Sequence, residues 1–330
     1  MVHERRFVAK SGPPERAQAV VKGEVGETDL ASFGSGHSRR PLITRVGAKI
    51  AQRMDGHLCL EPLDDGAFAR ASAVCMGAGR FMRAVLVPAL RELGCEVVLA
   101  QTRGHTFCDY MAARSDRSYE IDSVMPDGTV GTTRCAVAAC GSLGVPQGRA
   151  AFLALPSKLS CLRYIGVGLT EAGLVHNGDS INHLAALLHA CSMTRRAGGN
   201  SRVLSVINTD NVPWNGNALR AFVSSCDFTR GIPPLEAEPF AEWLRDHVVF
   251  HNTVVDRITS HRPNAPEVPR AEPLPRKTLV IEDARRVLPD TFGTVRGVHV
   301  RTRDGEIGLD LQLKLRACPP LPSLRTSTSC

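Results

Sequence analysis

The chain has 330 residues, of which 43% are hydrophobic and 22% are charged, so it can form one large or two ordinary domains with a real core. The net charge of +7 suits anionic ligands, but the basic residues are too diffuse to indicate a nucleic-acid-binding protein. Aromatic residues make up only 5%, so a stacking platform for single-stranded nucleic acid is not expected.

Cysteine and histidine patterns exclude two further classes of protein. The 11 cysteines include no CxxC pair, which argues against a secreted disulfide framework and a zinc ribbon. The 11 histidines show no HExxH motif, so no metal site is expected. No uncharged apolar run approaches the ~18 residues of a membrane helix, and the N-terminus lacks a secretory signal. A cytoplasmic protein without a membrane partner is predicted.

Residues 1–70 are predicted to be an N-terminal extension. Residues 1–40 are rich in glycine, serine, proline and charge without an apolar period, which indicates disorder. Residues 41–70 carry scattered apolar positions, which allow a helix outside the main domain.

Strand and helix patterns alternate from residue 71 onward. Ala71–Met76 is predicted to be a buried parallel strand, and Glu96–Ala100 the next one. The helix between them covers Phe81–Leu93 and ends at Gly94, although Pro88 would kink it.

A hairpin interrupts this alternation, with an Asp127-Gly128 turn between Tyr119–Val124 and Val130–Ala139. The alternation then resumes with a strand at Leu162–Leu169, a helix capped by Asp179, a strand at Arg202–Ile207, helices that include Asn217–Val223 and Phe240–His247, and a strand at Val248–Phe250. The pattern predicts an α/β fold of the Rossmann type, with a doubly wound and mostly parallel sheet.

Two proline-rich stretches are predicted to lie outside regular structure. Residues 261–277 hold five prolines, which is typical of a loop or an interdomain linker, and a strand follows at Thr278–Ile281. Residues 318–330 show no period at all. We therefore expect a dinucleotide-binding domain at 71–275 and the truncated start of a helical second domain at 276–330, with an irregular tail.

A glycine-rich turn joins the first strand to its helix. In a dinucleotide site the first glycine, here Gly77, makes the turn, and the second, here Gly79, lets the backbone approach the pyrophosphate. Met82 stands where the third glycine of GxGxxG would be, so an ordinary strand–helix turn is the alternative.

The second strand ends without the acid that usually binds the adenosine ribose. Gln101, Thr102 and Arg103 stand there instead, and Arg103 suits a 2′-phosphate. This favours NADP or the use of both nucleotides, and a solvated loop cation is the alternative.

Two later segments carry candidate polar groups. In Asn208–Gly216, the amide of Asn211 suits a hydrogen bond to a developing alkoxide, and an Asx-rich turn with Asn215 as helix cap is the alternative. Asp256 and Arg257 lie between apolar residues, where a structural ion pair is the alternative to a functional role.

Four segments in order, GAGRFMRA, GLTEAGL, NTDNVPWNG and VVFHNTVVDRITS, resemble the mannitol dehydrogenase family of polyol-specific long-chain dehydrogenases. The family also includes mannitol-1-phosphate dehydrogenase and the tagaturonate and fructuronate reductases. LVIED at Leu279–Asp283 resembles the opening of the family's second domain.

The resemblance implies a zinc-independent oxidoreductase that moves a hydride between NAD or NADP and a sugar alcohol, a ketose or a hexuronate. It implies Lys314 as general base, Asn211 as oxyanion donor and Asp256 as organiser of substrate or lysine. The implied cofactor residues are Gly77, Gly79, Arg80, Phe81, Arg83, Gln101, Arg103, Thr170 and Glu171.

The catalytic helix of the family, K-L-R-x-x-N-x-x-H, is only half present. Lys314-Leu315-Arg316 matches, but Pro319 stands in place of Asn and Pro322 in place of His. Two hypotheses follow: a polyol dehydrogenase impaired by truncation, or a catalytically inactive NAD(P)-binding fragment. The substrate, the choice of nucleotide and the oligomeric state stay open.

Overall fold

The computed structural model describes residues 61–62, 65–169, 173–210, 212–273 and 278–302. The expectations for residues 1–60 and for the tail after residue 302 lie outside this part of the chain.

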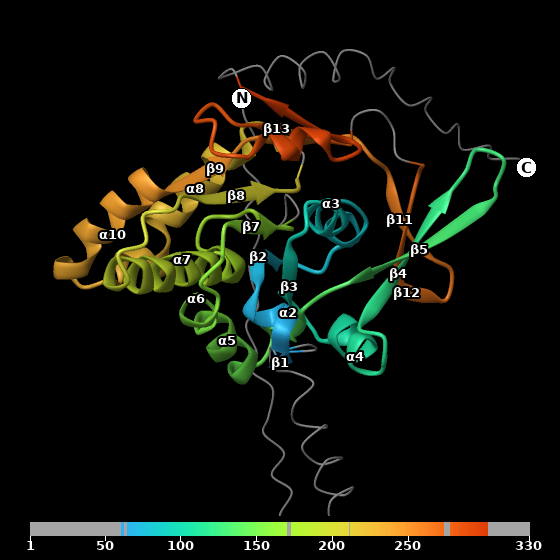
Figure 1. The fold of residues 1–330 in the computed structure, drawn as a ribbon. Helices are drawn as coiled ribbons and strands as arrows, with labels where there is room; N and C mark the ends of the chain where they lie inside the picture. The colour runs from blue at the N-terminus through green and yellow to red at the C-terminus, as the bar shows by residue number, and fades with distance from the viewer. Residues whose placement is uncertain (1–60, 63–64, 170–172, 211, 274–277, 303–330) are drawn as a thin grey trace, which may run out of the picture. The chain divides into compact units, whose positions relative to one another are not determined.

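The main sheet has seven strands in the order β1-β6-β3-β2-β7-β8-β9, and every neighbouring pair is parallel except β1 and β6 (Figure 1). The strands are β1 (Glu61–Pro62), β2 (Ala71–Met76), β3 (Glu96–Gln101), β6 (Ala139–Ser142), β7 (Tyr164–Val167), β8 (Leu204–Asn208) and β9 (Val248–His251). Counted from β2 along the chain, the six parallel strands have the doubly wound order 3-2-1-4-5-6. The predicted Rossmann-like α/β class is confirmed.

Helices cover both faces of this sheet. They are α2 (Asp65–Ala69), the π-helical segment η1 (Met82–Leu86), α3 (Val87–Glu92), α4 (Thr106–Ala112), α5 (Pro146–Leu153), α6 (Leu155–Lys158), α7 (Asp179–Ala197), α8 (Asn215–Ser225), α9 (Asp227–Arg230) and α10 (Pro234–His247). Val74 and Met76 of β2 belong to the core under α7, whereas Ala73 and Cys75 belong to the core under η1 and α3. Burial on both faces is the reason that the strand reads as a continuous apolar run.

The helix predicted at 81–93 is split because of Pro88. Val87 donates its N–H to the carbonyl of Met82, five residues back, and Pro88 then lies in the first turn of α3. Proline has no N–H, so the carbonyls four and five residues earlier need other donors. The Tyr119 hydroxyl donates to the Arg83 carbonyl at 2.7 Å, and Arg257 Nη1 donates to the Ala84 carbonyl at 3.3 Å.

The predicted hairpin is confirmed as β4 (Ser118–Val124) and β5 (Val130–Ala136), which pair antiparallel. Gly128 takes φ +85°, and the Asp127 carboxylate accepts the Thr129 N–H at 2.9 Å. The second strand is shorter than predicted because the chain leaves the hairpin after Ala136 and enters β6 of the main sheet.

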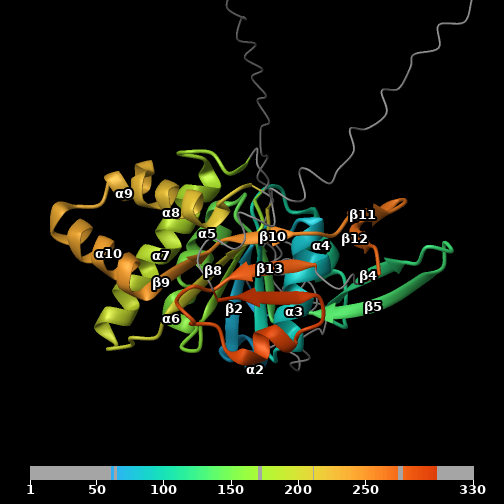
Figure 2. The same ribbon diagram turned by 90° about the horizontal axis from the view of Figure 1, so that it is seen from above.

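The linker predicted over residues 261–277 is wrong for most of its length. β11 (Thr259–Arg262) and β12 (Ala265–Ala271) extend the hairpin into a four-stranded sheet, β11-β12-β4-β5, despite Pro266 and Pro269 (Figure 2). Pairing of β12 with β4 is confined to Arg270 and Ala271. Both prolines therefore lie where β12 has β11 as its strand neighbour, which is an edge-like position that tolerates a missing N–H.

Buried charge holds these strands together. Asp122 of β4 is 1% exposed and accepts hydrogen bonds from Arg262 (2.7 and 2.9 Å) and Arg270 (3.1 Å). The Arg262 guanidinium is the main reason that the pKa of Asp122 lies well below its usual range. The cations of the expected linker are thus the partners of a buried carboxylate.

A third sheet, β10-β13-β14, contains β10 (Thr253–Val255), β13 (Leu279–Glu282) and β14 (Val298–Arg301) (Figure 2). β13 confirms the strand predicted at 278–281, and the short helix η3 (Asp290–Thr294) precedes β14. The proposed domain boundary at residue 275 falls between β10 and β13 along the chain and stays a prediction.

Three helices begin at other residues than predicted. The cap of α7 is Gly178, and Asp179 is the first helical residue, where a carboxylate favours the helix dipole. α8 begins at Asn215 after Trp214, which takes φ +56°. α10 begins at Pro234, six residues before the predicted start, because Pro233 and Pro234 suit a helix N-terminus.

Candidate functional site

The glycine turn follows β2 at the centre of the main sheet, where the strand order reverses. Gly77 takes φ +104°, and a Cβ there would lie 2.6 Å from the carbonyl oxygen of Gly168, which follows β7. Gly77 donates its N–H to the Ala100 carbonyl at 2.7 Å, and Gly168 donates to the Met76 carbonyl at 2.8 Å. Glycine is required at Gly77 by both its conformation and this close approach. Ligands of open α/β sheets bind at such a reversal point.

Met82 can stand in place of the third glycine because a glycine on the facing strand β7 leaves room for its side chain. Met82 is 1% exposed, and a Cβ on Gly166 of β7 would lie 3.3 Å from its terminal carbon. The same Cβ would lie 2.8 Å from the side chain of Leu86. The small residue that allows close helix–strand packing therefore stands on β7 instead of on the helix.

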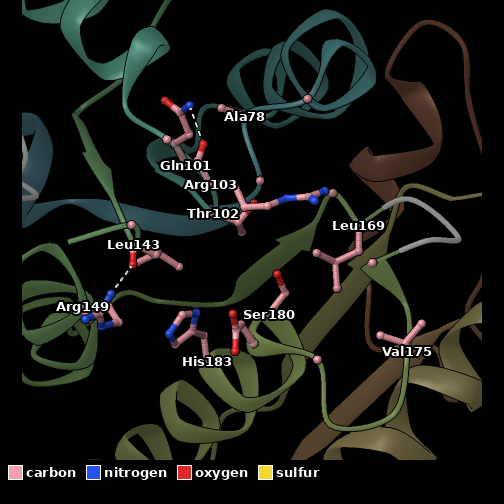
Figure 3. Close-up of a pocket in the computed structure, with 18 residues that line it drawn as sticks. Ala78, Gln101, Thr102, Arg103, Leu143, Arg149, Leu169, Val175, Ser180 and His183 are labelled. Atoms are coloured by element: carbon pink, nitrogen blue, oxygen red, sulfur yellow. Dashed lines mark hydrogen bonds between the residues drawn. The ribbon is translucent and has the colours of Figure 1, made fainter. Parts of the chain in front are cut away.

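A cavity of about 840 Å³ opens at the carboxyl ends of β2, β3, β6 and β7 (Figure 3). Its lining residues are Gly77, Ala78, Gly79, Gln101, Thr102, Arg103, Gly104, Leu143, Gly144, Arg149, Gly168, Leu169, Gly173, Val175, Gly178, Asp179, Ser180 and His183. The predicted residues Gly77, Gly79, Gln101 and Arg103 are thus brought together in one wall.

The side-chain amide of Gln101 is hydrogen-bonded to other groups of the protein. Its Nε2 donates to the Arg103 carbonyl at 2.8 Å, and its Oε1 accepts the N–H groups of Phe107 and Cys108 at 3.1 and 3.3 Å. The amide therefore supplies a missing acceptor at the start of α4 and fixes the turn between β3 and α4. Its predicted contact with cofactor has to compete with these bonds.

The three other predicted residues of the glycine segment do not line the cavity. Arg83 is 5% exposed, and its guanidinium binds the carbonyls of Ala78, Pro266 and Glu267 and stacks on the Phe107 ring. Arg80 is exposed and Phe81 is half-buried. Arg83 joins the glycine turn to β12, so its contacts are structural.

The N-terminal end of α7 forms the wall that faces the turn after β3. Ser180 and His183 point into the cavity in Figure 3. The Nδ1 atom of His183 is buried without a hydrogen-bond partner among the described residues. Burial, followed by the charge of Arg149, lowers the pKa of His183, which keeps the imidazole neutral near pH 7.

The segment after β8 is held to β10 by Asn215. This buried amide donates from Nδ2 to the Thr253 Oγ1 at 2.9 Å and accepts the Thr253 N–H on Oδ1 at 2.9 Å. Thr253 Oγ1 donates in turn to the Asn208 carbonyl at 2.7 Å. The Asn208 amide is fully buried, and neither of its polar atoms has a partner among the described residues. Asn215 is not the helix cap, but its side chain joins the start of α8 to β10.

The histidine of VVFHN, His251, is the last residue of β9 and lies against the start of α8. His251 is 1% exposed, and its Nδ1 donates to the Glu282 carbonyl at 2.9 Å. Burial lowers its pKa, so the ring stays neutral although Asp283 lies 3.9 Å away. A Cβ on Gly216 would lie 2.5 Å from the His251 carbonyl, which shows how closely α8 approaches β9.

Asp256 and Arg257 follow β10. Asp256 is exposed, does not line the cavity, and donates its N–H to the Thr278 carbonyl at 2.8 Å. The Arg257 guanidinium binds the Glu272 and Ala84 carbonyls, so it joins β10 to β12 and to η1. Arg257 therefore has backbone partners where an ion pair was the alternative hypothesis.

Four predicted residues, Asn211, Thr170, Glu171 and Lys314, lie outside the described residues. Sequence reasoning missed the cavity residues Leu143, Gly144, Arg149, Gly168, Ser180 and His183. Only their place in the chain could have indicated them, because they follow the third and fourth parallel strands or lie near the start of the next helix. Within the described ranges, no group of three or more His, Cys, Asp and Glu side chains is placed to hold a metal ion. Nor does any helix there have the length and hydropathy of a membrane span.

Residues 71–293 match the family model described as the mannitol dehydrogenase Rossmann domain. No curated protein matches the chain. Among solved structures, an octopine dehydrogenase with NADH and L-arginine is 9% identical, with a TM-score of 0.45 over 74% of this chain and 51% of that one. A yersinopine dehydrogenase with bound NADP⁺ is 11% identical, with a TM-score of 0.41 over 70% of this chain and 47% of that one. The matched region spans about half the length of these proteins.

Proposed function

Because the chain belongs to the mannitol dehydrogenase family, a family of NAD(P)-dependent oxidoreductases, we propose that it acts on polyols. The cofactor is NAD or NADP. The proposed reaction transfers a hydride between the nicotinamide and a sugar alcohol, with a ketose or a hexuronate as the oxidised partner. The family match over residues 71–293 is the observation that carries this proposal.

The residues present suit a dinucleotide. Gly77 and Gly79 line the cavity just before a helix, which is where a pyrophosphate is bound in this fold. A Cβ added to Gly79 would meet no other atom within 4 Å, so a phosphate can approach its backbone. When bound, the nicotinamide accepts or gives the hydride, and the protein positions the substrate and its proton.

The proton chemistry is assigned to residues named by the family pattern. Lys314 takes the hydroxyl proton as general base, Asn211 donates a hydrogen bond to the substrate oxygen, and Asp256 orients the substrate or the lysine. Exposure of Asp256 at the end of β10 leaves it accessible for that role.

The experiment is an assay of NAD(P)H oxidation with fructose, fructose 6-phosphate, tagaturonate and fructuronate. Turnover with one of them supports the proposal. A rate below the ~1–10³ per second ordinary for enzymes is expected, because Pro319 and Pro322 replace the second amide and the histidine. Lys314→Ala is then expected to lower kcat by ~10²–10⁴-fold, which is the usual contribution of a general base, without changing cofactor affinity. An unchanged kcat in this variant would remove Lys314 from the mechanism.

A second candidate function is nucleotide binding without turnover. Pro319 and Pro322 favour it, because they stand where the family pattern has the second amide and the histidine. Loss of one oxyanion donor alone typically costs ~10²–10³ in rate. Cofactor binding without oxidation of any of the four substrates would support this alternative over the first.

A further inference from the structure

The turn that joins β3 to α4 is held by contacts within the protein. The Gln101 side chain bridges Arg103 and the first N–H groups of α4, as described above. Ser142 Oγ donates to the Gly104 carbonyl at 2.5 Å, and Leu143 donates its N–H to the Gln101 carbonyl at 2.8 Å. Residues 102 and 103 are therefore held at a defined place in the cavity wall.

Among the described residues, no carboxylate stands at this turn. In NAD-specific Rossmann domains an acid at the end of the second strand binds the ribose 2′-hydroxyl. Here that strand ends at Gln101, whose amide is engaged on both sides. The next acid along the chain is Asp109 of α4, whose carboxylate is hydrogen-bonded to His105 Nδ1. Within the described part of the chain, the end of β3 therefore does not provide the acid that selects NAD and repels a 2′-phosphate.

Two donors stand there instead. Thr102 and Arg103 both line the cavity, and neither side chain bonds to any residue within the described ranges. In Figure 3 the Arg103 side chain extends across the cavity toward Leu169. Arg149 adds a second cation to the wall, while Asp179 is the only carboxylate among the lining residues described. Counted over its described residues, the wall carries an excess of positive charge, and the Thr102 hydroxyl and the Arg103 guanidinium are without partners among them.

We propose that Thr102 and Arg103 bind the 2′-phosphate of NADP(H), so that this chain prefers NADP(H) to NAD(H). The proposal rests on the proposed function only in placing the cofactor in this cavity. A guanidinium binds phosphate oxygens with charge-assisted hydrogen bonds, and the threonine hydroxyl adds one more donor. Because the turn is already ordered, binding requires little rearrangement.

The test is isothermal titration of the full chain with NADP⁺, NAD⁺, adenosine 2′,5′-bisphosphate and 5′-AMP. We expect NADP⁺ to bind about 10- to 100-fold more tightly than NAD⁺, the range of one or two charge-assisted hydrogen bonds. The two adenosine fragments should show the same order. Arg103→Gln should remove most of this ratio, and Thr102→Val a smaller part.

The matched control is Arg196→Gln. Arg196 is exposed in the last turn of α7, about 24 Å along the helix from Ser180 at 1.5 Å per residue. This variant should keep the wild-type ratio, and thermal melts should show all three variants folded. Equal affinity for NADP⁺ and NAD⁺, or a ratio that survives Arg103→Gln, overturns the proposal. Since the readout is binding, absence of polyol turnover would contradict the proposed function and leave this inference standing.

Discussion

Two groups of polar side chains behave in opposite ways. The scaffold corner comprises Asn208, Asn215, Asn252 and Thr253, which lie at the ends of β8 and β9 and the start of β10, and the second corner comprises Thr102 and Arg103 after β3. After β8 and β9, the amides of Asn215 and Asn252 bond to neighbouring backbone and side chains, and Arg257 does the same after β10. After β3, the side chains of Thr102 and Arg103 have no protein partner in the described part of the chain. Residues of a recognisable motif can thus serve the scaffold, while side chains without protein partners among the described residues stand in a turn that carries no motif.

The largest effect on stability is expected at the glycine turn after β2. Gly77→Ala places a Cβ 2.6 Å from the Gly168 carbonyl at a backbone φ of +104°. We expect a loss of about 3 kcal/mol or more in the free energy of unfolding, from strain and overpacking together. Gly79→Ala is the control for stability, because nothing lies within 4 Å of its Cβ position. Urea unfolding of both variants measures the difference, and equal losses would contradict the turn geometry.

The scaffold corner should respond next most strongly. Asn215→Ala removes the acceptor of the buried Thr253 N–H and the amide donor to the Thr253 hydroxyl, so we expect a loss of about 2–4 kcal/mol in the free energy of unfolding. Asn217→Ala, two residues later in α8, changes an exposed asparagine and should be neutral within about 0.5 kcal/mol. A loss below about 1 kcal/mol for Asn215→Ala would mean that this network does not hold the corner.

Acid should weaken the scaffold corner through His251. Burial lowers the pKa of this histidine below the value of about 6.5 that it has in the unfolded chain. Between those two values the unfolded state binds more protons, so stability falls as the pH falls. His251→Asn should reduce the loss of stability between about pH 7.5 and about pH 5.5. His261→Asn at an exposed site should leave it unchanged, and an equal slope in the His251 variant would refute the assignment.

The smallest effect is expected at Asn208, the last residue of β8, whose carbonyl accepts the Thr253 hydroxyl. Its buried amide has no partner among the described residues, so its burial costs free energy. Asn208→Leu, of similar volume, should be neutral or stabilising by about 1 kcal/mol. Measured destabilisation of more than about 1 kcal/mol would show that the amide is satisfied in the protein and belongs with the scaffold.

Part of the candidate site could be predicted because its signals are local. Gly77 and Gly79 were recognisable from a strand, a turn and a helix in succession, and the cavity does form there. The resemblance of GLTEAGL, which begins at Gly168, implied Thr170 and Glu171 as cofactor residues. Ser180 and His183 of the opposite wall were missed because they come from the helix after the fourth parallel strand. Whether these residues line the cavity depends on the order of the strands in the sheet, which the hydrophobic periodicity of the sequence does not predict. The resemblance also implied a cofactor role for Arg83, whose guanidinium binds backbone carbonyls of β12 in the structure.

By itself, the sequence determined the alternation of strands and helices, the Asp127-Gly128 hairpin and the strand–helix turn at Gly77, because burial period and turn chemistry are properties of neighbouring residues. Only the tertiary structure decided that the proline-rich residues 265–271 form a strand. Their backbone is satisfied by β11, by a short pairing with β4, and by Arg83 from more than 180 residues earlier in the chain. It likewise decided that Gly166 on β7 replaces the missing third glycine, because packing space is shared between a helix and the strand it covers.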